Sequence, residues 1–126
     1  MKNSLIILAL FTLLFSCTEA EIDPSAVNIR LANTSNFDYK NIVINTTTGN
    51  VRFGDLNSGK SSEYKAFEMA YRYAYVELEI NGNILKLQPF DYVGETPLEN
   101  GKYTYEIYTD SPDQEYGSLS ITLIKD

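Results

Sequence analysis

The chain has 126 residues, with ten lysines and arginines against seventeen aspartates and glutamates, which gives a formal net charge of −7. Such an acidic chain lacks the Lys and Arg that supply most of the affinity for nucleic acid, so nucleic acid is not expected as a partner. It contains no histidine and one cysteine. These counts exclude the usual forms of serine–histidine, cysteine–histidine and zinc chemistry, and they exclude an intramolecular disulfide.

The chain opens with an apolar run over residues 5–15 that follows Lys2. A run of that length is too short to span a bilayer, which takes about 20 apolar residues. It fits the hydrophobic region of a secretory signal, which has about 7–15 residues. We therefore expect residues 1–16 to be a signal peptide. The alternative is an ordinary cleaved signal that happens to lie beside a cysteine.

The four residues Leu14-Phe15-Ser16-Cys17 resemble the lipobox of bacterial lipoproteins. In that family, signal peptidase II cleaves just before the cysteine, which then carries diacylglycerol and an N-acyl chain such as palmitate. The resemblance implies that Cys17 is the lipidation site. Two or more acyl chains anchor a protein stably without a transmembrane helix. We therefore expect an envelope protein that contacts the membrane through lipid on Cys17.

Residues 17–25 are expected to form a polar tether after the lipid. Thr18, rather than aspartate, follows the cysteine, which argues against the inner-membrane retention signal of enterobacterial lipoproteins and favours the outer membrane, in a periplasmic or surface-facing position. Glu19, Glu21 and Asp23 loosely resemble the acidic export signals of surface lipoproteins in Bacteroidota. A solvated acidic linker explains them equally well.

Residues 26–126 predict one all-β domain, because apolar residues alternate with polar ones in short runs separated by turn residues. Asn81-Gly82 is typical of a type I′ hairpin, and Gly59 is expected to adopt a positive φ. The expected strands cover residues 27–31, 39–46, 51–53, 61–67, 72–80, 84–88, 101–109 and 119–123. Strands at this spacing indicate a single antiparallel β-sandwich of seven or eight strands, immunoglobulin-like or prealbumin-like.

Three stretches of the domain resemble small uncharacterised lipoproteins of Bacteroidota, and the resemblance covers most of the mature chain. These stretches are Tyr71-Arg72-Tyr73-Ala74-Tyr75, Asp91-Tyr92-Val93-Gly94-Glu95 and Gly101-Lys102-Tyr103-Thr104-Tyr105. The resemblance implies no catalytic residue, no cofactor and no known ligand.

Tyrosines on two predicted strands form the first candidate site. Tyr71, Tyr73 and Tyr75 share one strand face, and Tyr103 and Tyr105 share a face of another strand. If these strands are neighbours, the rings form a flat platform. Aromatic rings with polar tips suit sugar rings and extended peptides. The alternative is ordinary cross-strand packing of tyrosines within a sheet.

The longest irregular connection, residues 91–100, is a second candidate, with Tyr92 and Glu95 as its contact residues. Long loops on a rigid sandwich often carry binding function. The alternative is that Tyr92 and Val93 pack against the end of the sandwich while Gly94 permits a tight turn.

Acidic residues near the C-terminal strand offer a possible calcium site. Asp110, Asp113 and Glu115 carry oxygen ligands of the kind that calcium binds, but their spacing lacks the regular pattern of an EF-hand. A solvated acidic turn is the simpler interpretation, so we expect no metal site.

A pair of carboxylates is the remaining candidate for chemistry. Glu77 and Glu79 share one strand face, and Glu106 lies on another strand. Two carboxyl groups about 5–9.5 Å apart could act as in a glycosidase. Carboxylates two residues apart on a strand are more often the solvated side of a sheet.

Together these features predict a non-enzymatic, lipid-anchored envelope protein that needs no cofactor and acts as a binding or structural module. A glycan, a peptide or another envelope protein is the expected ligand, and Tyr73, Tyr75, Tyr92 and Tyr103 are the candidate binding residues. One alternative is a carboxylate-dependent hydrolase acting on envelope or extracellular glycans. Another is an accessory or inhibitory subunit that adds a strand to a partner's sheet.

Overall fold

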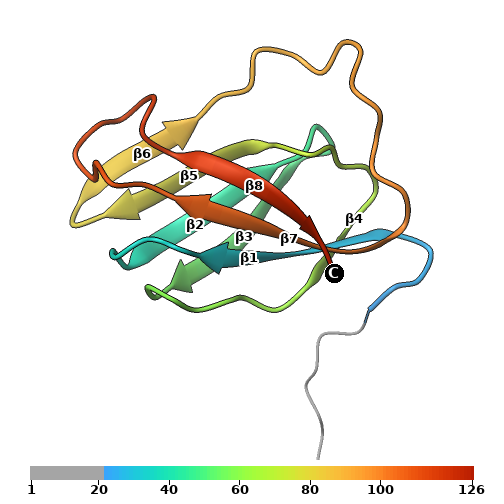
Figure 1. Ribbon diagram of the computed structural model, residues 1–126, viewed down its shortest axis with the longest axis horizontal. Helices are drawn as coiled ribbons and strands as arrows, with labels where there is room; N and C mark the ends of the chain where they lie inside the picture. Colours follow the sequence, from blue (N-terminus) through green and yellow to red (C-terminus); the bar gives the residue numbers. More distant parts are fainter. Residues whose placement is uncertain (1–21) are drawn as a thin grey trace, which may run out of the picture.

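The computed structural model describes residues 22–126, so Cys17 and the expected signal peptide lie outside the described residues. It contains eight strands and no helix among those residues. The strands are β1 (Val27–Asn33), β2 (Tyr39–Asn45), β3 (Asn50–Leu56), β4 (Lys65–Phe67), β5 (Tyr75–Ile80), β6 (Asn83–Leu87), β7 (Gly101–Tyr108) and β8 (Ser120–Lys125). They form two facing sheets (Figure 1). The prediction of an all-β, sandwich-like domain is confirmed.

Each sheet has four strands, in the orders β4-β1-β7-β8 and β3-β2-β5-β6. The expectation of a purely antiparallel sandwich is wrong at one pair, because β1 and β7 run parallel from Val27↔Gly101 to Asn33↔Ile107. Turn residues fix the relative direction of consecutive strands only. β1 and β7 lie far apart in the chain, so the path of the chain between the sheets sets their direction, and no local pattern reports it.

β5 begins at Tyr75, whereas the predicted strand began at residue 72. The three residues before Tyr75 continue the apolar alternation but do not pair with a neighbouring strand. The backbone just upstream bonds to the long connection between β6 and β7, where Leu98 N donates to Ala70 O at 2.8 Å. The alternation of apolar and polar residues therefore begins three residues before the paired part of β5.

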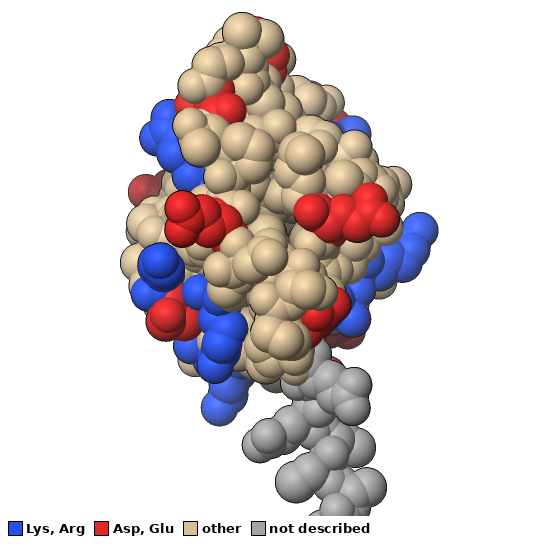
Figure 2. All heavy atoms as spheres, turned by 90° about the vertical axis from the view of Figure 1, so that its right-hand side faces the viewer, with Lys and Arg blue, Asp and Glu red and all other residues tan. Residues whose placement is uncertain are grey.

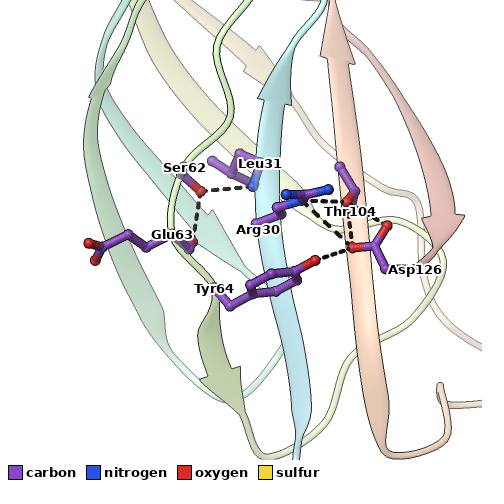
Figure 3. Close-up of polar contacts among 7 residues, drawn as sticks. All are labelled: Arg30, Leu31, Ser62, Glu63, Tyr64, Thr104 and Asp126. Atoms are coloured by element: carbon purple, nitrogen blue, oxygen red, sulfur yellow. Dashed lines mark hydrogen bonds and ion pairs between the residues drawn. The ribbon is translucent and has the colours of Figure 1, made fainter. Parts of the chain in front are cut away.

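β4 is also shorter than predicted, since it covers three residues and not the whole of 61–67. Upstream of it, Ser62 is joined to β1 in two ways. Ser62 N donates to Leu31 O at 2.8 Å, and Ser62 Oγ accepts a hydrogen bond from Leu31 N at 2.9 Å (Figure 3). The side-chain hydroxyl replaces a backbone carbonyl here, so the segment follows β1 without regular strand pairing.

Two predicted turns are confirmed by their backbone angles. Asn81 and Gly82 have φ of 50° and 85° between β5 and β6, as a type I′ hairpin requires. Gly59 has φ of 78°.

The core lies between the sheets and consists of the inward-facing apolar side chains of both. Its members are Val27, Ile29, Leu31, Tyr39, Ile42, Ile44, Leu56, Phe67, Ala70, Ala74, Val76, Leu78, Ile80, Leu85, Tyr103, Tyr105, Ile107 and Leu119. Burial of this apolar surface is the main term stabilising the fold. The two largest fully buried side chains, Tyr39 and Tyr105, also bury hydroxyl groups.

The side chain of Asn33, at the end of β1, connects the two sheets by hydrogen bonds. Asn33 is only 1% exposed. Its Nδ2 donates to Phe37 O at 2.7 Å and to Leu56 O at 2.9 Å. Its Oδ1 accepts from Ser35 N at 2.9 Å and from Ser35 Oγ at 2.8 Å. The amide thereby uses all of its donors and acceptor positions. Leu56 ends β3 in the opposite sheet, so this one side chain fixes the spacing between the layers.

We predict that Asn33→Ala lowers the free energy of unfolding by about 3 kcal/mol or more. The substitution removes the side-chain hydrogen bonds to Leu56 O, to Phe37 O and from Ser35 N, and a buried group that loses its partner costs about 1–3 kcal/mol. Urea denaturation followed by circular dichroism measures the loss. Asn36→Ala, in the exposed part of the same turn, is the control and should change stability by less than about 0.5 kcal/mol. Equal losses for the two variants would contradict the assignment.

Candidate functional site

Three tyrosine rings lie against one another at one end of the sandwich, and we call Tyr71, Tyr73 and Tyr92 the tyrosine stack. Tyr92 is common to both contacts, with its ring centroid 4.5 Å from that of Tyr71 and 5.4 Å from that of Tyr73, at interplanar angles of 22° and 16°. Tyr92 comes from the β6–β7 connection, residues 88–100, which arches over the upper right of Figure 1. The stack therefore fastens this connection to the segment before β5.

Hydrogen bonds from two tyrosine hydroxyls support the stack. Tyr105 OH donates from the core to Tyr71 O at 2.6 Å, and Tyr73 OH donates to Asp91 O at 3.0 Å. Burial raises the pKa of Tyr105 far above its ordinary value. Burial, with the neighbouring tyrosines, also raises the pKa of Tyr92. Tyr92 and Tyr105 therefore keep their hydroxyl protons at physiological pH.

An ion pair holds the far part of the connection. Arg72 Nε donates to Glu95 Oε1 at 2.9 Å, and a second guanidinium nitrogen lies 3.3 Å from the other carboxylate oxygen. The hydrogen bond from Arg72 lowers the pKa of the Glu95 carboxyl. The guanidinium also lies over the Tyr73 ring, 5.3 Å from its centroid. The connection is therefore attached through side chains at both of its contact residues, Tyr92 and Glu95.

Next to the stack, the outer surface of the β3-β2-β5-β6 sheet is hollowed to a volume of about 440 Å³. We call this the tyrosine–amide hollow. It is lined by Asn45, Thr47, Asn50, Tyr75, Gln88, Pro89 and Tyr92. None of these side chains is charged. Two rings and a proline supply flat apolar surface, and three amides and a hydroxyl supply hydrogen-bond donors and acceptors.

The backbone at the rim of the hollow is strained. Thr47 has a φ of 99°, a conformation that is a true outlier for a β-branched residue. Thr47 N donates to Asn45 Oδ1 at 2.8 Å, and Asn45 Nδ2 donates to Asn50 Oδ1 at 2.9 Å. These bonds set the orientation of the amides that line the hollow. Strain of this kind costs about 1–3 kcal/mol and collects at binding and active sites.

The connection also carries two fully exposed apolar residues. Phe90 and Val93 have relative exposures of 104% and 87%, on either side of Tyr92. Figure 2 shows uncharged atoms at the tip of the molecule, with acidic atoms on both sides just below it. Residues of this kind at a protruding loop commonly mark contact surfaces.

The predicted binding tyrosines divide between this surface and the core. Tyr73 and Tyr92 lie in the stack, and Tyr75 and Tyr92 line the hollow. Tyr103 is only 4% exposed and donates its hydroxyl to Glu99 O at 2.8 Å. Its side of β7 faces the core, so Tyr103 does not join a surface platform with the others. We expected a platform of tyrosines from two neighbouring strands. The exposed tyrosines come instead from the start of β5, at Tyr75, from the segment before it and from the β6–β7 connection.

The three glutamates considered for hydrolysis do not come together. Glu77 and Glu79 point outward from β5, because Val76, Leu78 and Ile80 of that strand are buried. Glu106 points outward from β7, in the other sheet. The carboxylates therefore lie on opposite outer faces of the sandwich, not on two sides of one cleft.

The acidic loop before β8 is engaged in a different contact. Glu115 Oε2 lies 3.3 Å from Lys86 Nζ, and Glu115 O accepts from Lys86 N. Asp110 and Asp113 are exposed. Within residues 22–126, no three acidic side chains are arranged to hold a metal ion.

Cys17 lies outside the described residues, so its lipidation stays a prediction. None of the segments in residues 22–126 forms a helix with the length and apolar character needed to cross a bilayer.

Comparison with known proteins adds information on the fold alone. No protein-family model matches the chain, and no curated protein matches it. The solved NMR structure of a protein from Eubacterium rectale is similar, with a TM-score of 0.51 and 20% sequence identity, over 77% of this chain and 88% of that chain. Similarity at this identity indicates a related arrangement of strands and carries no function across.

We predict that alkaline pH destabilises the fold through its buried tyrosines. Burial raises the pKa of Tyr39 to about 12 and raises that of Tyr105 further, whereas an unfolded tyrosine titrates near pH 10. The stabilisation is complete below about pH 10 and is lost as the pH rises toward the folded pKa, because only the unfolded state releases its proton there. Urea denaturation at pH 8, 10 and 11 measures this decline.

Tyr105→Phe separates the hydrogen bond that Tyr105 donates from the pH dependence of stability that its hydroxyl causes. At pH 8 it should cost about 1–3 kcal/mol, since Tyr71 O loses its buried donor. Between pH 10 and 11 it should show a smaller decline than the parent protein. Tyr116→Phe, at a residue with 59% exposure, should leave both the stability and its pH dependence unchanged. A parent-like alkaline decline in Tyr105→Phe would contradict the assignment.

Proposed function

We propose that this chain is a lipid-anchored, non-catalytic binding protein of the bacterial envelope that recognises a neutral glycan in the tyrosine–amide hollow. The observation that carries the proposal is the lining of the hollow, which combines tyrosine rings with amides and a hydroxyl and contains no charged side chain. Ring faces stack on the apolar faces of sugars, while amides exchange hydrogen bonds with sugar hydroxyls. An ionic ligand would find no counter-charge in the lining.

The proposed anchor is lipid on Cys17, in the outer membrane and facing the periplasm or the exterior. Figure 1 supports a direction for the tether: the described chain enters at the lower right, whereas the β6–β7 connection lies at the upper end of the molecule. A domain held by its N-terminal end would thus keep the upper part of the β6–β7 connection away from the lipid. The anchor would raise the local concentration of binding sites along the membrane, which suits weak single contacts with a polymer.

We also infer that the sandwich is prealbumin-like rather than immunoglobulin-like. The immunoglobulin arrangement places the first, second, fourth and fifth strands in one sheet. Here β1 and β4 lie in one sheet, and β2 and β5 lie in the other.

The anchor predicts the behaviour of a Cys17→Ala variant expressed as the full-length chain in a bacterial host. It should incorporate no labelled palmitate and should leave the membrane fraction, because no acyl chain remains to hold the domain. Thr18→Ala, which keeps the cysteine, is the matched control and should stay labelled and membrane-bound. Palmitate label and membrane retention in Cys17→Ala would disprove the assignment.

The hollow predicts selective binding on an array of neutral, sialylated and sulfated glycans probed with the purified lipoprotein in detergent. Neutral glycans should bind, and titration with the best of them should show about a tenfold loss for Tyr75→Ala, the value of one ring contact at the upper end of its range. Tyr75→Phe, which keeps the ring, should bind within about threefold of the parent.

Tyr116→Ala is the control for this experiment, since Tyr116 is an exposed ring that does not line the hollow. The bound glycan should be recovered intact. Binding confined to charged glycans, an unchanged affinity in Tyr75→Ala, or cleavage of the glycan would each overturn the proposal.

A further inference from the structure

The edges of the two sheets differ in how they are protected. Of the four edge strands among the described residues, β4 has only three residues, and Lys65 on it extends over the Phe53 ring. β3 pairs with β2 through register shifts and carries Gly54 at a φ of 76°. β6 is covered in part by the loop before β8, where Lys86 N donates to Glu115 O. Short length, irregular pairing and covering loops are the usual protections of a sheet edge.

β8 has none of these protections. Its six residues, Ser120–Lys125, contain no glycine or proline, and only the last is charged. It pairs with β7 in a continuous register without a shift. It is the outer strand of its sheet, with β7 on one side and, among residues 22–126, no paired strand on the other. β8 is therefore a regular strand of high β-propensity with one open side.

The hydrogen bonding at the end of β8 identifies which backbone groups face that open side. Asp126 N donates to Lys102 O at 2.9 Å, so even-numbered residues here face β7. The N–H and C=O groups of Ile121, Leu123 and Lys125 therefore point away from the sheet. Apart from the ladder with β7, no hydrogen bond described within residues 22–126 engages these groups.

A polar cluster around Asp126 fixes the register of β8 against β7 (Figure 3). The Asp126 carboxylate accepts hydrogen bonds from Thr104 Oγ1 at 2.8 and 3.0 Å and from Tyr64 OH at 2.6 Å. Arg30 Nε donates to the same threonine at 3.0 Å, and its guanidinium lies 5.1 Å from the Tyr64 ring centroid. β8 cannot slip along β7 without breaking these contacts.

The open side of β8 is also accessible. A hollow of about 410 Å³ lies along it, lined by Arg72, Tyr73, Ile121, Thr122 and Leu123. An added strand would approach through this space.

We propose that β8 pairs in antiparallel fashion with β8 of a second copy of this chain, in a two-fold arrangement centred on Leu123. In this register Leu123 lies opposite Leu123 of the second copy, and Ile121 lies opposite Lys125 of the second copy. All three outward residues of each strand then exchange backbone hydrogen bonds. No other two-fold register of β8 uses all of these groups.

A second copy fits this edge because the strand is complementary to itself in that register. Thr122 lies opposite Ile124 of the second copy, and each lysine lies opposite an isoleucine, so no like charges face each other. Ile124, which is 40% exposed, gains a side-chain neighbour on the outer face. The contact is isologous and closes at two copies, so it does not propagate into a fibre. The pairing requires neither the glycan nor the lipid.

The test uses disulfide formation between two full-length copies with different tags, one carrying Thr122→Cys and the other Ile124→Cys, expressed together in the envelope. The proposed register makes these two positions a non-hydrogen-bonded pair with Cα atoms about 4.5 Å apart, within disulfide reach. Copies with the same substitution meet only diagonally, about 7–8 Å apart. Mild oxidation should therefore give a mixed dimer in at least about fivefold excess over either like dimer.

Two controls measure background in the same experiment. The parent chain, whose single cysteine is Cys17, reports any disulfide formed at that position. In the second control, a chain with Lys40→Cys, a cysteine on the other sheet, is expressed with one of the two β8 variants. Both should give no mixed dimer. A mixed dimer no more abundant than in these controls would overturn the proposal.

A further pair of substitutions distinguishes specific pairing from chance collision. Lys125→Pro removes an outward N–H that has no ladder partner in the single chain, so the edge strand tolerates it. It should reduce the mixed dimer at least about fivefold, whereas Lys125→Ala keeps the N–H and should retain the dimer. Membrane fractionation and glycan binding should be equal in both variants. Equal cross-linking in Lys125→Pro and Lys125→Ala would refute pairing through β8.

Discussion

The parallel pairing of β1 with β7 is the constraint on which the rest of the surface depends. Parallel strands begin at the same end of a sheet, so the chain that leaves β6 must reach the end where β1 starts before β7 can form. No tight hairpin can make that connection. The long β6–β7 connection follows from this requirement, and with it the position of Tyr92 above the strand end at Tyr75. The tyrosine stack and the hollow are thus consequences of topology as much as of local sequence.

The sequence predicted the parts of the fold that depend on neighbouring residues. Alternation of apolar and polar residues located eight strands, and Asn81-Gly82 located a hairpin, because side-chain orientation and backbone angles in these elements are local properties. The sequence-based prediction was wrong where contacts between distant segments determine strand direction or strand length. β7 runs parallel to its distant partner β1, and the chain before β5 bonds to the β6–β7 connection, where Leu98 N donates to Ala70 O, and not to a neighbouring strand. Neither partner is visible in a local pattern.

The site was predictable only in part, for the same reason. Tyr73, Tyr75 and Tyr92 were identified by residue type, but Tyr103 has the same chemistry and lies in the core, because strand alternation does not say which face is buried when both carry large residues. Asn45, Asn50 and Gln88 were not identified at all. Neutral amides near turns are common on protein surfaces, and only the fold brings these three together. The positive φ of Thr47 marks the rim of the hollow, yet threonine gives no sequence signal for it.

The two walls of the hollow differ in how they are attached. Asn45 and Tyr75 belong to strands of a sheet, whereas Pro89 and Tyr92 belong to a connection held by ring stacking and by the Arg72–Glu95 ion pair. The arginine side chain of that pair is two-thirds exposed, so dissolved electrolyte weakens the attraction while ring stacking is little affected. Ionic strength therefore acts on one of the two attachments of the wall that carries Pro89 and Tyr92, and leaves the other almost untouched.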